Sequence, residues 1–204
     1  MTKMKIRRAT ERAYCAVIAL LIIVSVSSSA SAQNFGWAST DFDRDGYYVG
    51  LGIGTGIDLE FKDSSFGEGQ SVSPGYGLNL RAGTKSAYMG GEFQLEYLDG
   101  FDVDGGAVAK GYDVLTFTVN FKGYLPLGRL QPFILVGGGA NVLWVDTSFG
   151  NKSYLGGALR GGAGVDFYLT RNWGIEAQGS YVMTTEETRD ADYLSANIGV
   201  FYRF

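Results

Sequence analysis

The last twelve residues, 193–204, have two faces of opposite polarity, because side chains along a β-strand alternate between its two sides. One face carries Leu194, Ala196, Ile198, Val200, Tyr202 and Phe204, and the other carries Ser195, Asn197, Gly199 and Arg203. The apolar face continues to the last residue of the sequence, whereas polar residues usually shield an edge strand of a soluble sheet. The pattern favours a strand that closes a barrel in lipid and ends on an aromatic residue at the membrane boundary. An ordinary edge strand is the alternative.

Composition limits the chemistry that the chain can perform. Its 204 residues include 31 Gly, 13 Tyr and 13 Phe, but only 3 Pro and no His. Histidine is the usual base at neutral pH and the commonest metal ligand, so its absence argues against a Ser/His hydrolase and against most zinc or copper sites. Residues that favour strands and turns are abundant, which indicates an all-β fold. We expect no cofactor and no bound metal.

Residues 1–32 have the three parts of a secretory signal peptide: a basic start, an apolar run and a small-residue end at Ala30-Ser31-Ala32. The apolar run, residues 15–26, is shorter than the roughly 20 residues that a membrane-spanning helix needs. Cys15, the only cysteine, lies at the start of this run, which argues against a lipoprotein. We expect cleavage after Ala32, which removes 5 of 17 basic and 1 of 21 acidic residues and leaves a net charge of −8.

A short lead-in, residues 33–46, precedes the first predicted strand. It contains the sequence DFDRDG at residues 41–46, which matches the front half of a calcium-binding loop. The position of the bidentate glutamate of an EF-hand is occupied by Gly52, and no helix flanks the run, so an EF-hand is excluded. We interpret the run as an acidic lead-in. An acidic exported chain also has little electrostatic reason to bind nucleic acid.

From residue 47 to residue 204 the chain divides into eight segments with a period of two, which we predict to be strands. They cover residues 47–61, 76–83, 89–97, 112–125, 131–145, 155–169, 173–183 and 193–204. Short turns are expected at 84–86, 126–129 and 170–172, and longer segments near 62–75, 99–111, 146–153 and 186–192. An even strand number with connections that alternate in length predicts an eight-stranded antiparallel up-and-down transmembrane β-barrel.

Alternation alone does not say which face lines the inside, since a soluble barrel also alternates. Aromatic residues gather near both ends of the predicted strands, as the two membrane interfaces require. Those near the turns are Tyr47, Tyr124, Phe167, Trp173, Tyr202 and Phe204, and those near the longer segments are Phe61, Tyr76, Tyr97, Tyr112, Trp144 and Tyr181. The segment 131–145 is apolar on both faces, and we assign Ile134, Val136, Val142 and Trp144 to the outside. We therefore predict an apolar exterior, with a soluble periplasmic barrel or sandwich as the alternative.

The polar face then places charges of both signs inside the barrel. The predicted lumen charge cluster consists of Asp58, Glu60, Arg81, Glu92, Glu96, Lys122, Arg160, Asp166, Glu176 and Arg203. Unpaired charges in such an interior cost several kcal/mol each, so we expect the carboxylates to pair with the four cations and water to satisfy the rest. Eight strands leave an interior that side chains fill, which favours a polar plug over a gate or a narrow ion path.

Four stretches resemble the small outer-membrane β-barrel family that includes opacity-type porin-family proteins and the transmembrane domain of OmpA. They are GYYVGLGIG at 46–54, PFILVGGG at 132–139, GAGVDFYL at 162–169 with NW at 172–173, and FYRF at 201–204. The resemblance implies a location in the outer membrane of a Gram-negative bacterium, in contact with outer-membrane lipid and lipopolysaccharide. It also implies insertion by the outer-membrane assembly machinery, with Val200, Tyr202 and Phe204 as the C-terminal assembly signal. No peptidoglycan-binding domain follows the barrel, so a tethering role is not implied.

Three functions remain open at this point. The leading hypothesis is a non-enzymatic barrel with a structural or surface-interaction role. Its longer segments are acidic and contain Asp99, Asp102, Asp104, Glu186, Glu187, Asp190 and Asp192. A narrow porin for ions or small solutes is the second hypothesis. An outer-membrane lipid-modifying enzyme is the third, but such enzymes rely on histidine. The sequence does not identify an external ligand.

Overall fold

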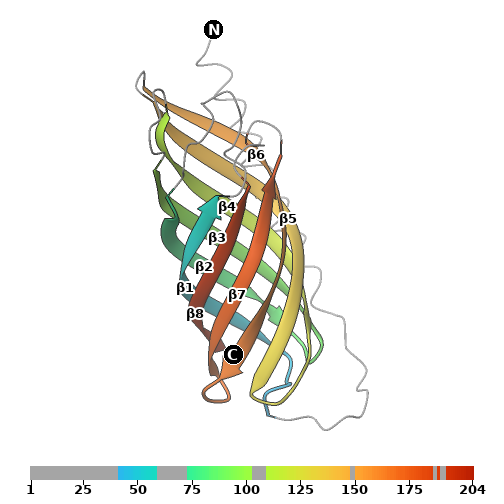
Figure 1. The fold of residues 1–204 in the computed structure, drawn as a ribbon. Coiled ribbons are helices and arrows are strands. Elements are labelled where there is room, and N and C mark those ends of the chain that lie inside the picture. The colour runs from blue at the N-terminus through green and yellow to red at the C-terminus, as the bar shows by residue number, and fades with distance from the viewer. Residues whose placement is uncertain (1–40, 59–72, 103–108, 148–149, 186–187, 189–191) are drawn as a thin grey trace. The chain divides into compact units, whose positions relative to one another are not determined.

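Eight antiparallel strands form a closed barrel in which each strand pairs with the next and β1 pairs with β8 (Figure 1). The structure is a computed structural model, which describes residues 41–58, 73–102, 109–147, 150–185, 188 and 192–204. The strands are β1 (Gly46–Asp58), β2 (Gly75–Lys85), β3 (Met89–Asp102), β4 (Ala109–Tyr124), β5 (Leu130–Thr147), β6 (Gly150–Tyr168), β7 (Trp173–Thr184) and β8 (Tyr193–Arg203). The predicted all-β, eight-stranded antiparallel barrel is confirmed.

The chain divides into two units, residues 1–37 and 38–204, and the described residues all belong to the second. Among these residues there is no helix long and apolar enough to cross a bilayer.

The two ends of the barrel differ in their connections. At one end, the turn end, short connections cover residues 86–88, 125–129 and 169–172, and the C-terminus lies at the same end (Figure 1). At the other, the loop end, the connections are 59–74, 103–108, 148–149 and 185–192. The predicted longer segment at 146–153 is wrong, because β5 and β6 stay paired up to Thr147 and Gly150. Polar residues there interrupt the alternation of apolar and polar residues, so the sequence pattern did not predict a strand. Backbone pairing does not depend on side-chain polarity.

The strands are unequal in length at the loop end. β6 pairs with β5 from Gly150 to Phe167, but with β7 only from Ala158 onward. The part of β6 formed by residues 150–157 therefore extends past the last residue of β7 that pairs with it.

The exterior is apolar and the interior is charged. Leu51 and Ile198 point outward and are 52% and 54% exposed, whereas Glu92 and Arg160 are each 1% exposed. This is the reverse of a soluble barrel, where the apolar face is the buried one. The assignment of β5 also holds, since Ile134 is 70% exposed.

The aromatic residues near the strand ends divide between the two faces. Tyr47, Tyr76 and Trp173 are exposed on the outside, as predicted for membrane girdles. Tyr112 and Tyr124 are buried in the lumen, so their assignment to the girdles is wrong. Both lie an even number of residues from the inward-facing Lys122, and this spacing, not closeness to a strand end, determines the face. Phe61 lies outside the described residues.

Inward-facing glycines allow neighbouring backbones to approach closely. A methyl group added at Gly139 would overlap the carbonyl oxygen of Phe117, whereas one added at the outward-facing Gly161 would meet nothing within 4 Å. We expect Gly139→Ala to lower the free energy of unfolding by about 1–3 kcal/mol, because the backbone must shift. Gly161→Ala is the matched control and should change it by less than about 0.5 kcal/mol. Urea unfolding in lipid vesicles measures both, and equal effects would contradict the close approach.

Candidate functional site

The structure places most of the predicted charge cluster inside the lumen, distributed along its length. Eight of the ten side chains are buried there: Arg81, Glu92, Glu96, Lys122, Arg160, Asp166, Glu176 and Arg203. Asp58 is half-buried at the loop end of β1 and accepts a hydrogen bond from the Tyr112 hydroxyl, and Glu60 lies outside the described residues. Lys85 joins the cluster although the sequence pattern assigned it to a turn. Lys85 lies four residues after Arg81 and therefore on the same face of the strand, and this spacing could have predicted that it points inward.

Four charges form a continuous chain across the middle of the lumen. Lys122 Nζ donates to Glu92 Oε2 at 2.7 Å and to Glu176 Oε2 at 3.0 Å. The other oxygen of Glu176 pairs with Arg81. Glu92 also accepts a hydrogen bond of 2.7 Å from the hydroxyl of Tyr48. The four charges balance, and they link β2, β3, β4 and β7 across the interior.

A second ion pair lies toward the loop end, between Arg160 and Glu96. Ser195 Oγ and Asn197 Nδ2 donate to Glu96 Oε1 at 2.5 and 2.8 Å. The Tyr193 hydroxyl donates to Glu96 Oε2 at 3.2 Å. Because donors from β6 and β8 converge on a carboxylate of β3, this buried pair links three strands.

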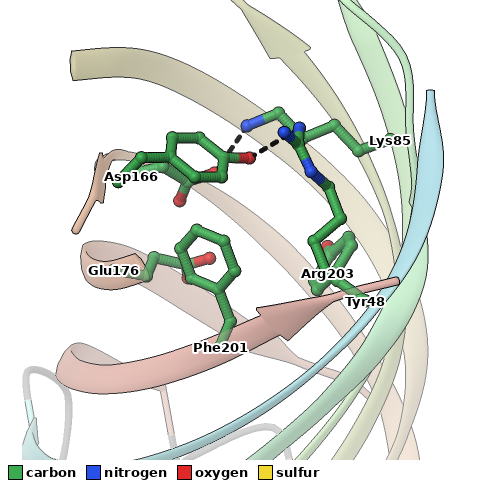
Figure 2. Close-up of a pocket in the computed structure, with 7 residues that line it drawn as sticks. Tyr48, Lys85, Asp166, Glu176, Phe201 and Arg203 are labelled. Carbon is green, nitrogen blue, oxygen red and sulfur yellow. Dashed lines mark hydrogen bonds and ion pairs between the residues drawn. The ribbon is translucent and has the colours of Figure 1, made fainter. Parts of the chain in front are cut away.

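A third pair lies at the turn end. Lys85 Nζ donates to Asp166 Oδ2 at 2.7 Å and lies 3.7 Å from the centre of the Tyr124 ring. Figure 2 shows side chains from β1, β2, β6, β7 and β8 converging here around a small hollow. Its lining residues are Tyr48, Lys85, Asp166, Tyr168, Glu176, Phe201 and Arg203. The hollow is too small to admit a water molecule.

Arg203 behaves differently from the other cations. Its Nη1 donates to the Tyr168 hydroxyl at 3.0 Å and to the carbonyl oxygens of Phe42 and Arg44 at 2.8 and 3.3 Å. Among the described residues, no carboxylate forms an ion pair with it, so the expectation that each cation pairs with a carboxylate is wrong for Arg203. The Phe42 and Arg44 carbonyls take the place of the expected carboxylate, because the lead-in contacts the barrel. The sequence pattern did not indicate this contact.

The loop end of the lumen is closed by an apolar cluster, which the sequence analysis missed. It consists of Leu98, Phe101, Tyr112, Val114, Leu143, Ala158, Val182 and Tyr193. The rings of Phe101 and Tyr112 stack with their centres 4.6 Å apart. A register shift between Leu98 and Phe101 turns both residues inward, although three positions separate them. The ion pairs of the lumen therefore lie on the turn-end side of this apolar cluster.

The predicted assembly residues lie on the outside at the turn end. Val200 and Phe204 are exposed and Tyr202 is half-exposed. The Tyr202 ring packs edge-on against Trp173 and Phe204, with ring centres 5.0 and 5.1 Å away. This geometry presents a small aromatic group at the membrane boundary.

The described residues contain no group of three or more His, Cys, Asp or Glu side chains that could hold a metal ion. In the acidic run of the lead-in, Asp41 pairs with Arg171 at 2.7 Å, and Asp43 accepts a hydrogen bond of 2.9 Å from Gln131. These two carboxylates therefore have partners within the protein.

A closed eight-stranded barrel with an apolar exterior and a charged, side-chain-filled interior defines an integral outer-membrane β-barrel protein. A family model described as "outer membrane protein beta-barrel domain" matches residues 16–204. The chain belongs to this family and is located in the bacterial outer membrane.

Solved structures with the same fold come from several bacteria. Neisserial surface protein A is 13% identical, with 78% of this chain and 97% of that chain covered and a TM-score of 0.63. OprG from Pseudomonas aeruginosa is 17% identical, with 81% and 99% covered and a TM-score of 0.60. Ail, the attachment invasion locus protein of Yersinia pestis, crystallised with the heparin analogue sucrose octasulfate, is 18% identical, with 79% and 99% covered and a TM-score of 0.56. No curated protein matches the sequence.

Proposed function

We propose that the protein is a non-enzymatic, non-conducting barrel that holds its loop end at the outer surface of the cell. The observation that carries this proposal is the double closure of the lumen. Charged pairs fill its middle, and the apolar cluster around Phe101 and Tyr112 fills its loop end. An ion crossing such an interior must leave water without a replacement hydration shell, which is costly.

The orientation follows the general rule that outer-membrane barrels have short periplasmic turns and longer external loops. The turn end then faces the periplasm, and the loop end carries any surface interaction. Asp99 is exposed there. Asp192 is buried and accepts hydrogen bonds of 2.6 Å from the Tyr181 hydroxyl and the Thr184 amide, so it fixes the loop base. The side chain of Asp102 and residues Asp104, Glu186, Glu187 and Asp190 lie outside the described part.

The proposed partners are outer-membrane lipid and lipopolysaccharide around the wall, and the assembly machinery during insertion. The exposed row of Val200, Tyr202 and Phe204 supports the second. The acidic composition of the loop segments makes a polyanion such as the heparin analogue bound to Ail an unfavourable ligand for this chain. We therefore propose a neutral or cationic partner at the loop end.

Two other functions fit less well. A lipid-modifying enzyme that uses histidine is disfavoured because the sequence contains none. A narrow porin would need a polar path through the loop end, where the apolar cluster lies.

Planar-bilayer recording tests the closed lumen. The folded protein should give no discrete conductance steps, because side chains fill the interior. Slower or faster gel migration after boiling, compared with the unboiled sample, verifies that the added protein was a folded barrel. Steps that change when Arg81 or Arg160 is replaced would contradict the proposal and support the porin.

A further inference from the structure

The segment before β1, residues 41–44, lies across the turn end of the barrel, and we name it the strap. It is joined to β1, which lies opposite β5 in the ring of eight strands. Nevertheless, Gln131 at the start of β5 donates through Nε2 to the Phe42 carbonyl at 3.2 Å and to Asp43 Oδ1 at 2.9 Å. Figure 1 shows the blue segment before β1 at the same end as the start of β5. The strap therefore crosses the opening of the barrel at the turn end, from β1 to β5.

The strap also supplies two carbonyl acceptors to Nη1 of a buried cation. Arg203 has no exposed surface, and two of its hydrogen-bond acceptors are the Phe42 and Arg44 carbonyl oxygens of the strap. Its guanidinium lies 4.6 Å from the centre of the Tyr168 ring. A buried guanidinium without acceptors would cost several kcal/mol, so these contacts favour the closed position of the strap.

Side-chain contacts hold the strap on both sides of the mouth. The Phe42 ring packs on Tyr168 with centres 5.6 Å apart, and the Arg129 guanidinium lies 5.3 Å from the centre of the Phe42 ring. Asp41 pairs with Arg171 at 2.7 Å, but both side chains are more than half exposed, so this pair adds little to the stability of the closed strap. Phe42 is thus the anchor of the strap.

We propose that the strap is a built-in plug that closes the turn end of the lumen and shields Arg203 and the side chains behind it from water. The hollow is lined by Lys85, Asp166, Phe201 and Arg203, among others (Figure 2). Tyr168 belongs to its lining and also contacts the Phe42 ring. The proposal concerns the turn end alone and is independent of the apolar closure at the loop end.

Thiol accessibility tests the plug. Phe201→Cys, in a Cys15→Ala background that has no other cysteine, places a reporter in the hollow. A strap variant, with Asp41, Phe42 and Asp43 each replaced by Gly, removes the anchor ring and the two carboxylates. In detergent micelles, a water-soluble maleimide should modify the reporter on the order of tenfold faster in the strap variant, which corresponds to about 1.4 kcal/mol of closing free energy lost.

Ser153→Cys, exposed at the loop end, is the matched control and should react at the same rate with either strap. Heat-dependent gel migration verifies folding of every variant. Should the triple variant not fold, the single variant Phe42→Ala should still raise the reporter's rate severalfold. A reporter rate that is the same with the intact and the altered strap, whether fast or slow, would overturn the plug. The bilayer recording tests the closed lumen of the whole barrel separately, so failure of one proposal is distinguishable from failure of the other.

Discussion

Arg160→Met is expected to lower the free energy of unfolding by about 3–5 kcal/mol, because it leaves a buried carboxylate without its cation. Glu96 is fully buried, and the three donors from Ser195, Asn197 and Tyr193 remain after the substitution but carry no charge. Urea unfolding of the barrel in lipid vesicles, followed by tryptophan fluorescence, measures the loss.

Two controls separate the buried charge from general damage at this position. The double variant Arg160→Met with Glu96→Gln should recover much of the loss, since no buried charge is then left unpaired. Arg171→Ala removes the exposed pair with Asp41, whose side chains are 69% and 58% exposed, and should cost at most about 1 kcal/mol. If Arg160→Met were no more harmful than Arg171→Ala, the interior would be wet, not sealed.

Ile198→Arg is expected to cost about 2–4 kcal/mol, because it places a charge on the lipid-facing wall near the bilayer midplane. Ile198 lies in the middle of β8, between Ile53 of β1 and Ala177 of β7 in the sheet register. It is 54% exposed, so an arginine would not clash with protein, and its cost would come from the surrounding lipid. The same unfolding experiment in vesicles measures it.

Leu169→Arg is the matched control for depth. Leu169 is 48% exposed but lies in the turn between β6 and β7, where a charge near the interface should cost only about 0–1 kcal/mol. Similar costs at the two positions would mean that the wall around Ile198 is not embedded in lipid.

The sequence predicted the direction of side chains better than their partners. The alternation of side chains with a period of two predicted which face of each strand points outward, including β5, which is apolar on both faces. A shift of one residue would expose the whole polar face to lipid. The alternation fails where the period itself changes. The register shift between Leu98 and Phe101 turns Phe101 inward, whereas the sequence analysis placed this residue in a connecting segment, and local composition gives no sign of the shift.

Contacts between distant parts of the chain were beyond the sequence pattern for a different reason. Glu96 and Arg160 are 64 residues apart, and Arg203 meets Phe42 across 161 residues. Alternation identifies that these groups face inward, but the height of each in the lumen depends on the register of several strand pairs together. The strap was missed because it has no periodicity and makes its contacts only with the assembled ring.

The unequal lengths of β6 and β7 give the barrel a slanted rim. Residues 150–157 of β6 continue beyond Ala158, where its pairing with β7 begins, and at about 3.3 Å per residue they add roughly 26 Å of strand. With the tilt of about 40° usual in such barrels, the tip of the β5–β6 hairpin stands about 20 Å beyond the point where β6 stops pairing with β7. The β5–β6 hairpin therefore presents paired strand to a partner that approaches from that end.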